Sequence, residues 1–209
     1  MNNSRVLWIK VWGIAALQGA ITLSWVIYNL YLPILLVQLG LGQKIAIALL
    51  IGENLLEALI EPIFGRFSDH QQQFFGSRIP VVTAGIVLSS ALFIAIPSLI
   101  IFAPSNIKKP LFLVLVVAWA SAMAIYRSPA MAILGRCATI DSLPQAASVL
   151  TLVGGLVGAF RFDAYGLIVE MGADFAFALG SFSLLVAGGI LRWFNPSEAP
   201  KVVEQHPQR

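Results

Sequence analysis

The sequence predicts an all-α membrane protein with six transmembrane helices, and three observations support this fold class. First, 58% of the 209 residues are apolar and only 11% are charged, whereas a soluble domain carries about 25% charged residues. Second, the apolar residues fall into six runs of about the 20 residues that a transmembrane helix needs. Third, only short polar segments separate these runs. This composition excludes an ordinary soluble domain, a disordered chain and a nucleic-acid-binding domain.

The first half of the chain contains three predicted spans. Residues 11–39 form the first, which is too long for a signal-peptide core and lacks a cleavage site, so we expect it to be retained. The polar residues before it, 1–10, form the predicted N-terminal tail. The second and third spans are predicted at residues 45–64 and 81–102, joined by a polar loop at 65–80.

The second half contains three more spans, predicted at residues 111–134, 145–168 and 175–194. A polar loop separates the first two of these, and a tight turn separates the last two. The final segment, residues 195–209, contains three prolines and several charges. It is predicted to be a disordered tail or linker. The chain is therefore expected to form one six-helix unit, residues 11–194, between two polar ends.

The basic residues predict the orientation of this unit. An even number of spans places both ends of the chain on one side of the membrane, and lysine and arginine mark the cytoplasmic side. Eight of the 13 basic residues lie on the side of the termini, and three lie on the opposite side. Both termini are therefore predicted to be cytoplasmic.

Three glutamates interrupt the second predicted span: Glu53, Glu57 and Glu61. A charge at the centre of a bilayer costs about 2.5–3.5 kcal/mol on insertion scales. Residues four apart lie on one face of a helix, with a drift of about 40° per step. Either some of these carboxyls are protonated or a cation lies among them, so the stripe predicts a proton or cation site. The alternatives are that Glu61 only reaches the aqueous interface and that Glu53 only hydrogen-bonds across helices.

Arg127 lies in the fourth predicted span, at a depth similar to that of Glu57 and Glu61. We predict that it approaches one of these two glutamates, because pairing offsets part of the cost of burying both charges. Such a pair is either a switch that couples transport to a proton or a purely structural contact.

Polar and aromatic residues also interrupt the first predicted span. Tyr28, Asn29 and Tyr31, together with Gln18 and Trp25, are candidates to line a substrate cavity. The alternative is that the aromatic residues are interfacial anchors, which are common in membrane proteins.

Other features limit the chemistry. The single cysteine excludes a disulfide within the chain, and no histidine lies in a predicted span. Motifs for hydrolysis or phosphoryl transfer are missing, so we expect neither an enzyme nor a metal site nor an organic cofactor. In the fifth span, Gly154 and Gly158 form a GxxxG motif, which predicts close helix packing.

The predicted loop after the second span resembles the signature loop of the major facilitator superfamily. Its pattern, Gly-x-x-Ser-Asp followed by Gly-x-Arg-x-Pro, is similar to that of the glycoside–pentoside–hexuronide cation symporters and the sucrose carriers. The matching residues are Gly65, Ser68, Asp69, Gly76, Arg78 and Pro80. Just before them, Glu57 and Glu61 resemble the acidic pair that forms the coupling-cation site of melibiose-type carriers. Residues 127–134 and 152–156 resemble a cyanobacterial-looking branch of the family.

The resemblance implies a fold and a function. The fold is the N-terminal six-helix half of a major facilitator carrier, itself a 3+3 inverted repeat, with Asp69 and Arg78 as a charged latch on the cytoplasmic face. The function is that of half a secondary active transporter in a bacterial inner membrane. It would move a small polar solute, for example a sugar, together with a proton or sodium ion by alternating access.

Two departures from the family qualify this expectation. Arg127 stands where melibiose-type carriers have an aspartate, which favours protons over sodium. The carriers have twelve spans, so the expected partner, besides the lipid bilayer, is a second six-helix half, either another copy or a separate chain. The alternative is a non-transporting membrane assembly protein or a truncated remnant of a carrier.

Overall fold

The computed structural model describes residues 7–75, 77–138, 141–163 and 165–194, and this part of the chain is built from α-helices, without strands. Its eight helices are α1 (Trp8–Gln38), α2 (Gln43–Phe75), α3 (Ile79–Phe102), α4 (Lys108–Ala132), α5 (Leu134–Cys137), α6 (Leu143–Asp163), α7 (Tyr165–Glu170) and α8 (Ala173–Phe194). The predicted all-α class is therefore confirmed.

Four helical segments are long and apolar enough to cross a membrane: α1, α3, α4 together with α5, and α8. Helix α2 has 33 residues, but three glutamates interrupt its apolar stretch, so it does not join this group. The apolar part of α6 is shorter, Leu143–Ala159. The four apolar helices fit a membrane-embedded protein, and the prediction of six spans stays a prediction for α2 and α6.

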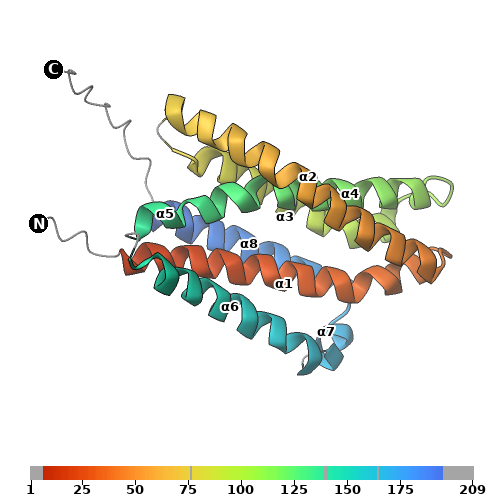
Figure 1. Cartoon of the computed structure of the whole chain (residues 1–209). Helices are drawn as coiled ribbons and strands as arrows, with labels where there is room; N and C mark the ends of the chain where they lie inside the picture. Colours follow the sequence, from red (N-terminus) through yellow and green to blue (C-terminus); the bar gives the residue numbers. More distant parts are fainter. Residues whose placement is uncertain (1–6, 76, 139–140, 164, 195–209) are drawn as a thin grey trace, which may run out of the picture.

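The long helices alternate in direction along one common axis (Figure 1). The first residue of α1 and the last residue of α8 lie at the same end, where Gly13 faces the ring of Phe194. The main side-by-side contacts follow the order α2, α4, α3, α8, α1, α6. Helices α2 and α6 therefore form the two ends of this order, and each packs mainly against a single long helix.

This packing order has an internal symmetry. If α1 is exchanged with α4, α2 with α6 and α3 with α8, the same order results in reverse. The two helices of each exchanged pair run in opposite directions (Figure 1). The first three long helices and the last three therefore follow the same packing pattern, with one set inverted relative to the other.

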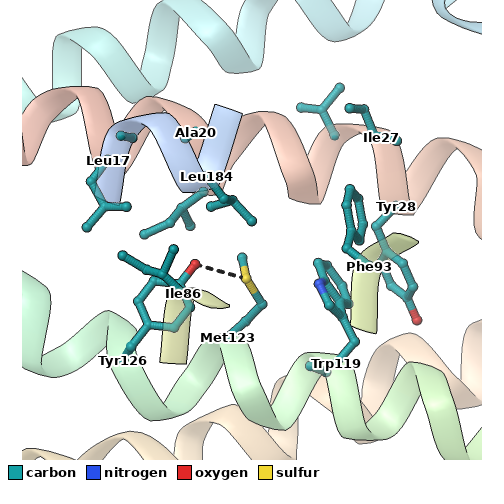
Figure 2. Packing of buried hydrophobic residues seen from close by; sticks show 14 of the residues in the cluster. Leu17, Ala20, Ile27, Tyr28, Ile86, Phe93, Trp119, Met123, Tyr126 and Leu184 are labelled. Carbon is teal, nitrogen blue, oxygen red and sulfur yellow. Dashed lines mark hydrogen bonds between the residues drawn. The ribbon is translucent and has the colours of Figure 1, made fainter. Parts of the chain in front are cut away.

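The centre of the molecule is an aromatic core formed by α1, α3, α4 and α8 (Figure 2). The ring of Trp119 lies 4.5 Å from that of Tyr28 and stacks on Phe93 at 4.9 Å. Phe93 in turn lies 4.4 Å from Phe177. Gly180 allows this close approach, because a Cβ there would come within 2.6 Å of the Phe93 ring. Helices α3 and α8 thus meet through tight, apolar contacts.

One predicted boundary is wrong. The loop predicted at residues 65–80 is largely helical, since α2 continues to Phe75. Loss of hydropathy marks where a helix leaves an apolar region and not where it ends, and residues 66–75 contain no proline to stop the helix. The span predicted at 145–168 falls on α6 and α7, and residue 164 between them lies outside the described residues. The predicted tight turn before α8 is present, with Gly172 at a φ of +80°.

Candidate functional site

A polar cavity of about 300 Å³ lies between α1, α2 and α4. Six of the nine residues that line it are polar or charged, although they come from helices that are otherwise apolar. The lining residues are Gln18, Ile21, Thr22, Trp25 and Asn29 from α1, Leu50, Asn54 and Glu57 from α2, and Arg127 from α4. Because α2 packs mainly on α4 and touches α1 far less, the space between α1 and α2 is left for this cavity.

An ion-pair cluster forms one wall of the cavity. The Arg127 Nη1 atom lies 3.4 Å from Glu57 Oε2 and 3.6 Å from Glu61 Oε1. The contact predicted between Arg127 and one of these glutamates is therefore present, and Arg127 bridges both. The side chain of Glu57 is 13% exposed and that of Glu61 is 35% exposed, so Glu61 is the more accessible of the two. We refer to Glu57, Glu61 and Arg127 as the charged triad.

Helix α2 reaches α4 closely enough for this triad because of a glycine. Gly65, one turn after Glu61, faces Ser128 of α4, and a Cβ at Gly65 would lie 3.0 Å from the Ser128 Oγ atom. A Cβ at this position requires the Ser128 hydroxyl to rotate away, so glycine eases the close approach of the two helices. The signature-loop glycine predicted at a helix exit thus lies inside α2 and serves the approach of α4.

Glu53 lies apart from the charged triad. Its side chain is 2% exposed, and its Oε1 atom accepts a hydrogen bond of 2.5 Å from the hydroxyl of Tyr28. Its Oε2 atom is buried and makes no hydrogen bond within the described part of the chain. The drift of about 40° for each four-residue step turns Glu53 away from Arg127 and toward α1.

The three candidate cavity residues of α1 have different positions. Asn29 lines the cavity, as do Trp25 and Gln18. Tyr28 is fully buried beside it, where it contacts Glu53. Tyr31 faces α7 and α8 instead: its hydroxyl donates to the Ile168 carbonyl at 2.6 Å, and its ring lies 5.8 Å from that of Phe177. Tyr31 therefore joins helices and does not line this cavity.

Two polar lining residues were missed by the sequence analysis, Thr22 and Asn54. Thr22 has a detectable signal, because positions 18, 22, 25 and 29 follow the spacing of one helix face. Asn54 has a signal of the same kind, because positions 50, 54 and 57 also follow the spacing of one helix face.

The other residues of the signature-loop pattern are only partly described. Ser68 is fully buried on α2, Arg78 directly precedes α3, and Pro80 lies in the first turn of α3. Gly76 and the side chain of Asp69 lie outside the described residues. The latch between Asp69 and Arg78 therefore stays a prediction.

The predicted glycine motif of the fifth span packs against α1. A Cβ at Gly154 would lie 3.4 Å from the Thr22 hydroxyl, and Gly158 faces the methyl group of the same residue. Gly19 of α1 faces Val153 in return. The expectation of close helix packing is therefore confirmed, and it concerns the contact between α1 and α6.

Comparison of the chain with protein-family models, curated proteins and solved structures finds no match. In the residues that the structure describes, no group of three or more His, Cys, Asp or Glu side chains is arranged to hold a metal ion. The chemistry of the site therefore lies in the cavity, the charged triad and the Glu53–Tyr28 pair.

Proposed function

We propose that the chain is one half of a secondary active transporter that moves a small polar solute with a proton or another cation by alternating access. The observation that carries this proposal is the polar cavity, with Glu57 and Arg127 in its wall, between three helices of which α1 and α4 are apolar enough to cross a membrane. Ionisable groups are costly at such depth and typically mark solute or ion pathways.

The charged triad supports coupling to a cation. One guanidinium is shared between two carboxylates at 3.4 and 3.6 Å, so Arg127 does not neutralise both. When a proton or cation binds one of the two, Arg127 becomes free to pair fully with the other. Such an exchange of partners gives the site two arrangements, which is what coupled transport requires.

The packing order supports the proposal of a half. Its reversal symmetry, with antiparallel equivalents, is the pattern expected of an inverted repeat, with α2 and α6 as the second and fifth spans of a six-helix unit. The resemblance to major facilitator carriers adds a second such unit as partner, either another copy or a separate chain. In this proposal, both termini are cytoplasmic and the membrane is a bacterial inner membrane.

Uptake by proteoliposomes tests the proposal. The protein is reconstituted alone and with any second six-helix chain encoded beside it, and labelled sugars are offered under a proton gradient and, separately, a sodium gradient. We expect gradient-dependent uptake that Glu57→Gln reduces at least tenfold. Glu170→Gln, at the exposed end of α7, is the matched control and should keep full uptake.

Absence of uptake in every pairing, or full uptake in Glu57→Gln, would contradict the proposal. Purification in fixed stoichiometry with a larger membrane complex, without uptake, would instead favour a non-transporting assembly protein.

A further inference from the structure

We propose that Glu53 and Tyr28 form a proton-binding site of their own, separate from the charged triad, which ties α1 to α2 more strongly when it is empty than when it is loaded. The step from proton binding to transport rests on the proposed function. Proton binding itself does not rest on the proposed function, and it can be measured without any solute.

Glu53 is separated from the positive charge of Arg127. Tyr28 of α1, Glu57 of its own helix and Arg127 of α4 are the ionisable groups that the surrounding helices bring to this region. Arg127 is engaged by Glu57 and Glu61, one and two turns away. Glu53 therefore has a phenol as its hydrogen-bond partner, and a buried carboxylate without a cation is costly.

One carboxylate oxygen of Glu53 is available to bind a proton. Oε1 accepts the Tyr28 hydroxyl, while Oε2 is buried without a hydrogen bond in the described part of the chain. A proton that binds at Oε2 forms an O–H bond and cancels the charge, while Tyr28 continues to donate to Oε1. The rings of Trp25 and Trp119 pack against that of Tyr28, with centroids 5.7 and 4.5 Å from it, and Glu53 is 2% exposed. A proton needs no further ligands, which suits this enclosed position.

The Tyr28–Glu53 pair lies between helices α1 and α2. Contacts between α1 and α2 are few compared with those of α2 and α4, and the Tyr28–Glu53 hydrogen bond crosses between α1 and α2 beside the polar cavity. A hydroxyl bonds an ionised carboxylate about twice as strongly as a neutral one. Loading of Glu53 therefore weakens a link between the two helices that enclose the cavity, so that proton binding is coupled to cavity opening. Tyr28 is a positioning residue in this scheme.

Infrared difference spectroscopy of the full chain in lipid vesicles, recorded over a pH series without solute, tests the inference. We expect a protonated-carboxyl band at neutral pH that Glu53→Gln removes and Glu57→Gln retains. Tyr28→Phe should move the pH at which this band disappears upward by about one unit, since it deletes a hydrogen bond to the ionised form. Tyr31→Phe, which deletes a similarly buried hydroxyl from the same helix, should leave it unchanged.

Two outcomes would overturn the inference. These are a band that Glu53→Gln does not affect, and equal shifts of the band in Tyr28→Phe and Tyr31→Phe. If Glu53→Gln does not fold, the contrast between the two tyrosine variants decides alone. Loss of transport with an intact band would contradict the proposed function and leave the proton site standing.

Discussion

The contacts of α2 with α4 and of α6 with α1 occupy equivalent places in the packing order, yet they differ in chemistry. The α2–α4 contact contains the charged triad and one glycine, Gly65. The α6–α1 contact contains glycines on both helices, Gly19 facing Val153 and Gly154 facing Thr22. The same position in the fold thus carries ionisable groups on one side and glycine-mediated packing on the other. In the proposed function, α2 and α4 therefore supply the ionisable groups, while α6 supports α1.

The two contacts are nevertheless linked through α1. Gln18 and Thr22 both line the polar cavity and lie against Gly154 of α6. The α1 wall of the cavity therefore packs against α6 on its other side. A shift of α6 would move these two side chains relative to Glu57 and Arg127, which makes the α6–α1 contact a support for the site.

The largest expected effect comes from breaking the charged side of the comparison with Arg127→Gln. This change leaves Glu57 and Glu61 without their shared cation. Loss of charged hydrogen bonds costs about 1.5–3 kcal/mol, and the lower half of this range is expected because the Arg127 side chain is 38% exposed. Thermal unfolding in detergent measures the loss. Arg192→Gln, an exposed arginine at the end of α8, is the control, and an equal loss in both variants would contradict a special role for Arg127.

A smaller loss of stability is expected when alanine replaces the glycine in each of the two helix contacts, and the loss should differ between them. A Cβ at Gly19 would lie 3.0 Å from a methyl group of Val153, and one at Gly65 would lie 3.0 Å from the Ser128 hydroxyl. Valine is stiff about its first side-chain torsion, whereas the serine hydroxyl can rotate away. We therefore expect Gly19→Ala to lower the free energy of unfolding by about 1 kcal/mol and Gly65→Ala to lower it by less than half as much. The reverse order would show that α2 and α4 form the more rigid contact.

The parts of this comparison that depend on local spacing could be predicted from the sequence. Four-residue steps place Glu53, Glu57 and Glu61 near one face of a helix, and equal depth brings Arg127 to that face. The GxxxG spacing of Gly154 and Gly158 predicts a close contact. These arguments need only the period of the helix and the cost of buried charge, and both operate within one or two elements.

The parts that depend on how helices rotate against one another could not be predicted. The partner of Glu53 is Tyr28, 25 positions earlier, and nothing in the spacing of α1 distinguishes Tyr28, which turns toward α2, from Tyr31, which turns toward α7. The extension of α2 to Phe75 was missed for a similar reason. Hydropathy reports the surroundings of a helix, and these change before the helix ends.

The smallest expected effect is that of a substitution at Gly155, on the free face of α6. Its neighbour Gly154 faces α1, whereas a Cβ at Gly155 would meet nothing within 4 Å. Gly155 belongs to a groove of about 620 Å³ whose lining residues all come from α6. Gly155→Ala should therefore cause no loss in the free energy of unfolding, because no neighbour has to move and alanine is the better helix former, measured as above.

A bulkier change at the same position distinguishes an empty face from a covered one. If the second six-helix half packs against α6, Gly155→Leu should leave unfolding unchanged but weaken association of the two halves, measured by cross-linking in vesicles. The exposed face of α2 differs from that of α6, because it already presents two bulky side chains. Leu55 and Leu59 there are 63% and 59% exposed. A loss of association in Gly155→Leu without loss of stability would show that α6 contributes to the contact with the partner. Unchanged association would leave α6 with the support of α1 as its role.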